Sequence, residues 1–182
     1  MISDDLSQMI DRAMLFGAAI TPCVAERGCS IRISRSQRSI PALLWAVTLL
    51  ERTLPELLTF SFTVSQNVSV VAATKYHQIL RPFYRRWYES GHRTMPSINF
   101  SDDCIAWWMT GSITPFEDRM IKLNCANLCD RQIRNICDDT VLCKFKPVVE
   151  SHGIVLEDAA QAKVWLGSRV PDSIWRLPHA NS

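Results

Sequence analysis

The sequence predicts a small α/β (α+β) protein, in which a small mixed sheet is accompanied by an N-terminal helix and a helical C-terminal third. Hydrophobic residues make up 47% of the 182 positions and charged residues 21%, which is typical of a folded globular protein. Apolar residues recur at helical spacing in some segments and alternate with polar residues in others. The length suits one ordinary domain and no repeat or linker is visible, so we expect residues 1–182 to form a single domain.

The first hundred residues are predicted to alternate helices with strands. Ser3 and the acidic residues behind it favour a helix start, and Pro41 lies in the first turn of a second helix, where its missing N–H is harmless. Phe60, Phe62 and Val64 alternate with small hydroxyl residues, as in a half-buried strand. The expected elements are helix 3–17, strand 30–34, helix 39–54, strands 57–64 and 68–73, helix 74–91 and strand 94–100.

The C-terminal third is predicted to be mainly helical. Ser101 precedes Asp102 and Asp103 in a pattern that caps a short helix, although the two carboxylates could instead bind a metal. Thr114-Pro-Phe-Glu117 has the form of a capping box with proline at the first helical position. The expected elements are helices 104–109 and 114–138, strand 141–149 and helix 157–166. We therefore expect residues 101–182 to extend a core formed by residues 30–100.

The charge and hydropathy pattern excludes some partners. The formal net charge is +2, so binding to nucleic acid would depend on local clusters of basic residues. The apolar runs at 40–50 and 54–73 are interrupted by polar residues, so we expect no membrane insertion. Asp4 and Asp5 are unlike the basic start of a signal peptide. These observations predict a cytoplasmic protein.

The seven cysteines are not expected to form a disulfide framework. The odd count and the absence of a repeated spacing do not favour a disulfide framework. Cys125 and Cys129, followed by Cys137, are the nearest approach to a metal pattern, and on one helix they would stack on one side. Cysteine is a small hydrophobic residue that packs well there, so core packing is favoured over zinc and we expect no structural metal.

A basic cluster at residues 75–93 is the sharpest local feature. His77, Arg81 and Arg85 recur every four residues on the predicted helix, with Lys75 at its start and Arg86 beside them. Aromatic side chains between them could stack on bases or on a nucleotide. The alternative is an ordinary amphipathic helix with a solvated basic face.

Two further groups are weaker candidates. Arg38, with Arg32 and Arg35, could face the same cleft as Lys75, or belong to a solvated loop. Glu51 could hold a divalent ion or orient a water for hydrolysis, or lie at an ordinary exposed helix end.

Three stretches carry a family resemblance. Ser36-Gln37-Arg38 is followed by a helix, a proline-containing segment at 54–64 leads into a strand, and residues 84–98 contain Gly91 and Pro96. In this order they resemble the ParB/sulfiredoxin-like superfamily. The chain departs from that family at residues 73–77, where Ala-Thr-Lys-Tyr-His replaces the glycine and Arg pair that usually hold a phosphate.

Within that superfamily the chain is most similar to plasmid fertility-inhibition proteins of the oncogenic-suppression group. The resemblance implies ATP hydrolysis with Mg²⁺ and DNA cleavage that block DNA transfer through a type IV secretion system. Its partners would be non-specific DNA and a component or substrate of that system. The implied catalytic residues are Glu51, Lys75 and His77, and the implied phosphate-binding residues are Arg38, Lys75, Arg81, Arg85 and Arg86.

Two alternatives follow from the altered phosphate motif. The chain could be a catalytically inert protein that inhibits the same transfer apparatus by binding to it. It could also be a non-specific DNA-binding module.

Overall fold

The structure is a computed structural model that describes residues 4–22, 24, 26–53, 59–65, 69–112, 121–125, 128–151, 153–171 and 174. The chain divides into two compact units, Met1–Pro96 and Ser97–Ser182, which we call unit 1 and unit 2 and describe separately. Helices and antiparallel strands occur in both units, so the predicted α+β class is confirmed. That residues 1–182 act as one domain stays a prediction. None of the described helices is long and apolar enough to cross a membrane.

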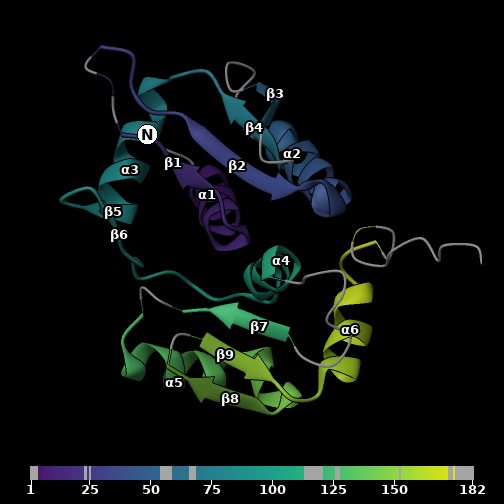
Figure 1. Cartoon of the computed structure of the whole chain (residues 1–182). Coiled ribbons are helices and arrows are strands. Elements are labelled where there is room, and N and C mark those ends of the chain that lie inside the picture. Colours follow the sequence, from purple (N-terminus) through teal and green to yellow (C-terminus); the bar gives the residue numbers. More distant parts are fainter. Residues whose placement is uncertain are drawn as a thin grey trace, which may run out of the picture. The chain divides into compact units, whose positions relative to one another are not determined.

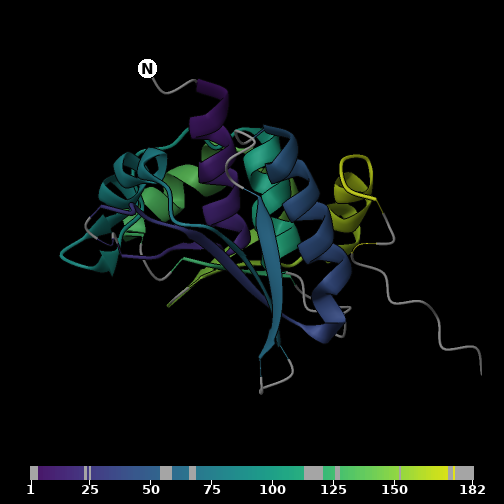
Figure 2. The same ribbon diagram turned by 90° about the horizontal axis from the view of Figure 1, so that it is seen from above.

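Unit 1 is built on a four-stranded antiparallel sheet with the order β1-β2-β4-β3. Its strands are β1 (Ala19–Ile20), β2 (Ile31–Ser36), β3 (Phe60–Ser65) and β4 (Ser69–Thr74). β3 and β4 form a hairpin that projects from the sheet (Figures 1 and 2). The strands at 30–34, 57–64 and 68–73 that the sequence predicts are therefore confirmed to within a few residues.

Two helices cover one face of this sheet. Helix α1 (Asp4–Phe16) contacts α2 (Ile40–Thr53), and α2 contacts β2 and β4. Ile33 and its cross-strand partner Ala72 are fully buried on the covered face. Leu43, Ala46, Val47 and Leu50 are buried residues that follow helical spacing in the middle of α2, whereas Leu44 is exposed.

The end of α1 is held by two arginines. Gly17 has φ +107°, and Gly17 N–H donates to Met14 O while Ala18 N–H donates to Ala13 O, closing the helix with a left-handed turn. Arg35 donates to Phe16 O, and Arg93 donates to Ala18 O (3.2 Å) and to Met14 O. Cations at this position satisfy the last helix carbonyls and oppose the negative end of the helix dipole.

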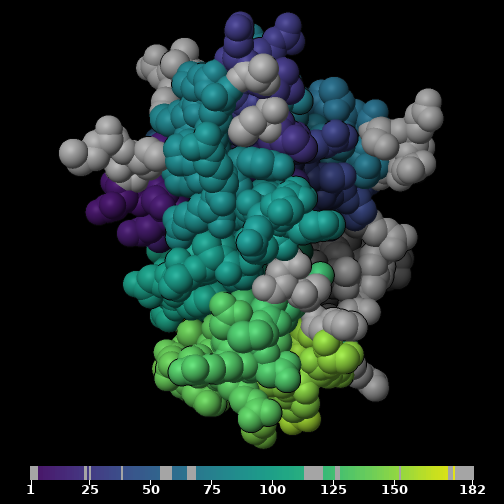
Figure 3. Space-filling model, turned by 90° about the vertical axis from the view of Figure 1, so that its left-hand side faces the viewer, coloured from purple at the N-terminus to yellow at the C-terminus, as the bar shows by residue number. Residues whose placement is uncertain are grey.

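The segment after β4 differs from the prediction. In place of one helix over 74–91, the chain forms a 3₁₀ turn (Gln78–Leu80), the short helix α3 (Arg81–Trp87) and a hairpin of β5 (Tyr88–Glu89) and β6 (His92–Arg93). Ser90 (φ 50°) and Gly91 (φ 82°) form the two-residue turn, which requires positive φ at both positions. The predicted strand at 94–100 is wrong, since these residues form no strand. The surface of α3 and this hairpin faces the viewer in Figure 3, in teal.

Unit 2 contains a sheet that the sequence did not predict. Its strands are β7 (Ile121–Asn124), β8 (Pro147–Glu150) and β9 (Gly153–Leu156), in the antiparallel order β7-β9-β8. Its helices are α4 (Asp102–Ser112), α5 (Asp130–Asp139) and α6 (Ala159–Gly167), with a 3₁₀ segment at Val141–Phe145. The predicted helix over 114–138 is thus wrong at β7, and the predicted strand over 141–149 begins only at Pro147.

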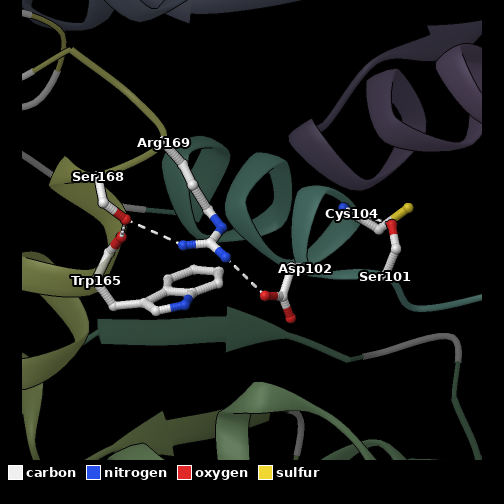
Figure 4. Close-up of polar contacts among 6 residues, drawn as sticks. All are labelled: Ser101, Asp102, Cys104, Trp165, Ser168 and Arg169. Carbon is white, nitrogen blue, oxygen red and sulfur yellow. Dashed lines mark hydrogen bonds and ion pairs between the residues drawn. The ribbon is translucent and has the colours of Figure 1, made fainter.

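The start of α4 is fixed by local contacts, shown in Figure 4. Ser101 Oγ accepts a hydrogen bond from Cys104 N–H (3.4 Å), so the predicted helix cap is confirmed. Asp102 forms an ion pair with Arg169 just after α6 (2.7 Å), and the Arg169 guanidinium lies 4.3 Å from the Trp165 ring centroid. Asp102 therefore has a structural partner, and its carboxylate joins α4 to the end of α6.

The two units repeat one topology. In each, a strand is followed by a helix and then by a two-stranded hairpin, and the last strand of the hairpin pairs with the first strand. The elements β2, α2, β3 and β4 of unit 1 thus correspond to β7, α5, β8 and β9 of unit 2. The repetition lies in the topology, and the sequence shows no matching repeat.

The cysteines of unit 2 occupy two kinds of position. Cys125 and Cys137 are buried, so the predicted core packing is confirmed there, whereas Cys129 and Cys143 are exposed. Burial raises the pKa of the Cys125 thiol to about 12, with a smaller contribution from Cys137. In unit 1, Cys29 is disulfide-bonded, so the prediction of no disulfide is wrong at this residue.

Candidate nucleic-acid interface

The uncovered face of the unit 1 sheet is the best candidate for a binding surface. Residues directly opposite one another in antiparallel strands point to the same side of the sheet. The register pairs Arg32 with Ala73 and Ala73 with Ser61, and it pairs Ser34 with Val71 and Val71 with Thr63. We call the surface formed by these six residues the open face; it comprises Arg32, Ser34, Ser61, Thr63, Val71 and Ala73.

The open face is polar and low in relief. Arg32, Ser34, Ser61 and Thr63 are exposed, whereas Val71 at its centre is 4% exposed. Serine and threonine hydroxyls both donate and accept hydrogen bonds, and they can contact phosphate oxygens as well as base edges. Because these side chains are short, a broad ligand could approach the sheet closely.

Positive charge lies at one end of the open face. Arg32 is the basic residue within it, and Lys75 follows Ala73, the register partner of Arg32, by two residues. Both side chains are exposed, and neither takes part in an ion pair with the described part of the chain. Two unpaired cations at one end of a hydroxyl-rich surface are suited to an anionic ligand.

His77, which the sequence suggests as a catalytic residue, has a structural role. Its backbone pairs with Cys29 through two hydrogen bonds of 2.8 and 3.1 Å. Its Nδ1 accepts the Ile79 N–H (3.2 Å) and so caps the 3₁₀ turn before α3. Gly28, at φ +89°, lies so close that an added Cβ would be 2.3 Å from the His77 carbonyl. The segment before β2 and the segment after β4 are therefore held together, backbone against backbone.

The arginines of α3 do not form one basic face. Arg86 is paired with Asp11 on α1 (2.9 Å) and donates to Ser7 Oγ (2.8 Å). The Arg81 Nε is buried and has no hydrogen-bond partner among the described residues, whereas Arg85 is exposed. Arg81, Arg85 and Arg86 are therefore not three equivalent cations on one surface.

Asp11 shows why Arg86 lies where it does. One carboxylate oxygen accepts from Arg86, and the other accepts from Trp87 Nε1 (3.0 Å). Burial raises the pKa of the Asp11 carboxyl, although the hydrogen bond from Trp87 and the charge of Arg86 act in the opposite direction. Arg86 thus compensates a buried charge and joins α3 to α1.

The remaining predicted site residues lie apart from one another. Glu51 is exposed at the end of α2, and its Oε1 accepts the Phe60 N–H (3.0 Å). Arg35, expected beside Arg38, turns instead to the end of α1, and burial lowers its pKa to about 10. The Arg38 side chain lies outside the described residues, and its backbone belongs to the 3₁₀ turn Gln37–Ser39.

A divalent ion at Glu51 stays a prediction. One carboxylate oxygen of Glu51 accepts a backbone amide, and no group of three potential metal ligands occurs within the described ranges.

The sequence alone does not predict the open face, although it contains a pattern that is consistent with it. The strand 30–34 and the strand around Phe62 were both recognised as alternating. The alternation also places Ser34, Thr63 and Arg32 on a single face once the strands are paired through β4. What was missing was the pairing, because β4 inserts between two strands that precede it in the chain.

Comparison with known proteins bears on the fold. No family model and no curated protein matches the sequence. Among solved structures, the chain is similar to the homing endonuclease I-WcaI bound to its DNA recognition sequence, with a TM-score of 0.58 and 9% sequence identity. The match covers 98% of this chain and 84% of that protein. At this identity, the similarity shows that the two chains share a fold.

Proposed function

We propose that this chain binds DNA through the open face of unit 1. The observation that carries the proposal is the sheet itself: one face is buried under helices, and the other presents exposed hydroxyls with an unpaired arginine. β-Ribbons and sheets are known readers of DNA grooves, and phosphates favour arginine, lysine and hydroxyl donors. The similar fold of a protein bound to DNA supports this choice of ligand.

The test compares two exposed arginines. Arg32→Ser removes the cation of the open face, and Arg85→Ser removes an equally accessible cation from α3. Binding of each variant to a fluorescent DNA duplex is measured by anisotropy over a salt series. We expect Arg32→Ser to weaken binding and to lower the slope of log K against log salt by about 0.9, the loss of one phosphate contact. Arg85→Ser should bind like the wild type.

Two outcomes would contradict this placement. A larger loss with Arg85→Ser than with Arg32→Ser would assign DNA to the helix surface. An unchanged affinity in both variants, with DNA bound normally, would remove the open face as the interface. Circular dichroism of both variants ensures that any loss is not caused by unfolding.

A finer function comes from the family resemblance and is a second proposal. The ParB/sulfiredoxin-like motifs imply that the chain hydrolyses ATP and cleaves DNA and that it blocks transfer through a type IV secretion system. The cytoplasmic location expected from the sequence agrees with this proposal. Lys75 supports it in one respect, because it is exposed directly after β4 at the place where the family holds a phosphate.

The second proposal is tested by incubating the protein with ATP and supercoiled plasmid, with Mg²⁺ or with a chelator. Lys75→Gln combined with Arg81→Gln should abolish Mg²⁺-dependent turnover. Equal Mg²⁺-dependent turnover in the wild type and the double variant would contradict this proposal. If there is no turnover but the transfer apparatus is still inhibited, the inert interaction inhibitor becomes the better description.

A further inference from the structure

The outer edge of β3 carries no charge and pairs with no other strand in the part of the chain that the structure describes. β3 is the last strand in the order β1-β2-β4-β3, and it pairs in unbroken register with β4. Its sequence, Phe-Ser-Phe-Thr-Val-Ser, contains no charge and no proline. Edge strands usually carry a lysine, a proline or a bulge that prevents further pairing. The six residues of β3 contain no lysine, no proline and no bulge.

The backbone of β3 offers hydrogen-bonding groups at this edge. Phe60 N–H donates to Glu51 Oε1 on α2, so it points away from β4. In an antiparallel ladder, alternate residues direct both N–H and C=O to the same neighbour. Phe62 and Val64 therefore direct their N–H and C=O groups outward as well. Glu51 occupies the first outward position and leaves these two residues as the open positions.

Apolar side chains lie beside these open groups. Phe62 is 47% exposed and Val64 73% exposed, and both point to the side of the sheet that carries α2. Leu44 on α2 is 48% exposed. Leu44 and Glu51 are two turns apart and therefore lie on the same face of α2. Glu51 on that face contacts Phe60 at the edge of β3.

The position of Leu44 along the length of β3 can be estimated from the contact between Glu51 and Phe60. α2 begins near the end of β2 and finishes beside Phe60, so it runs antiparallel to β3. The seven residues from Glu51 back to Leu44 span about 10 Å of helix, which equals about three residues of strand. By this estimate Leu44 lies level with Phe62 and Val64, and we call these three exposed apolar residues the edge cluster.

We propose that the edge cluster and the outer edge of β3 bind a second copy of this chain by antiparallel strand pairing. The strand is complementary to itself: a twofold axis at Thr63 places Phe62 opposite Val64 of the second copy. Each copy then satisfies the outward N–H and C=O groups of the other, and the two apolar rows meet on one face. No like charges are brought together, and the twofold arrangement closes as a dimer.

The dimer is tested with two matched substitutions. Val64→Lys places a charge in the edge cluster, and Val164→Lys makes the same change on α6, where valine is 78% exposed. Sedimentation velocity is measured without DNA over a concentration series. We expect a monomer–dimer equilibrium in the wild type and in Val164→Lys, and a monomer in Val64→Lys. Leu44→Lys should also be monomeric, and it tests the cluster without altering the strand.

Hydrogen exchange gives a second measurement. In the wild type, the amides of Phe62 and Val64 should exchange more slowly as the protein concentration rises, and in Val64→Lys they should not. A wild type that is monomeric throughout the series overturns the proposal, as does a dimer that persists in both Val64→Lys and Leu44→Lys. Because no DNA is present, the result is independent of the DNA-binding proposal, and Arg32→Ser should dimerise normally.

Discussion

Arginines in unit 1 show how strongly the surroundings of one residue type decide its role. Arg35 and Arg93 donate to carbonyls at the end of α1, and burial lowers the pKa of both guanidinium groups. Arg86 neutralises Asp11, whereas Arg32 extends from the open face without an ion pair to the described residues. Only an arginine that is exposed in this way, as Arg32 is, can bind a ligand through its guanidinium group. The count of basic residues is therefore a poor guide to the interface.

Cys125 gives a prediction at the scale of one residue. Its pKa is raised from 9.0 to about 12 by burial, so the native thiol keeps its proton at a pH where the unfolded thiol loses it. The native state then binds more protons, and the free energy of unfolding must fall as the pH rises from 9 to 12. The contribution approaches about 1.4 kcal/mol per pH unit within that window.

Urea unfolding of the wild type and of Cys125→Ala at pH values on either side of 9 measures this contribution. The wild type should lose stability with rising pH more steeply than the variant, and Cys129→Ala should keep the wild-type slope because Cys129 is exposed. Thiol alkylation of the native protein should label Cys129 and Cys143 before Cys125. Early labelling of Cys125 or equal slopes would show that its thiol is not protected.

At the scale of elements, the Asp11 network joins two helices that are far apart in the sequence. Asp11→Ala removes the acceptor of the buried Trp87 N–H and the ion pair that Asp11 forms with Arg86. We expect the free energy of unfolding to fall by about 3 kcal/mol, as for a broken buried pair. Asp5→Ala, an exposed change on the same helix, should lower it by less than about 1 kcal/mol. Chemical denaturation at neutral pH measures both.

An equal loss of stability in the two variants would mean that the network contributes nothing beyond the charge on α1. Asp11→Asn provides a further control, because the amide oxygen can still accept the Trp87 N–H while the charge is removed. Its stability should lie between those of the wild type and Asp11→Ala.

The elements that the sequence predicts correctly are those with long, regular patterns. The N-terminal helix, α2, the β3–β4 hairpin, α4 and α6 all follow clear periods or caps. The sequence does not predict β7, because its four residues lie between segments whose sequences resemble helices. The capping box that starts α5 uses the Cys129 side chain, which is not a usual cap residue. β9 is buried at all four positions and so shows no alternation.

The candidate site was predictable only in part for a related reason. Lys75 was identified from its local sequence, and the structure finds it exposed at the end of β4. Arg32 reaches the same face as Thr63 because β2 pairs with β4, which lies about forty residues further along the chain, and no local pattern records this pairing. The four-residue spacing groups His77, Arg81 and Arg85 on one predicted helix, but the helix begins only at Arg81.

At the scale of the whole molecule, the chain is a repetition of one topology. Both units place the last strand of a hairpin between the hairpin partner and an earlier strand. In unit 1 this arrangement creates the open face at its centre and the edge of β3 at its margin. The proposed DNA and dimer surfaces are therefore two consequences of the same strand order.

That strand order also governs assembly during synthesis. Chains emerge from the ribosome N-terminus first, and the central strand of each sheet is the last of its three long strands to appear. β2 and β3 have no common neighbour until Thr74 has emerged, and β7 and β8 have none until Leu156 has emerged. Each unit can therefore complete its sheet only after its final strand has been synthesised, and until then the earlier strands lack their native partner.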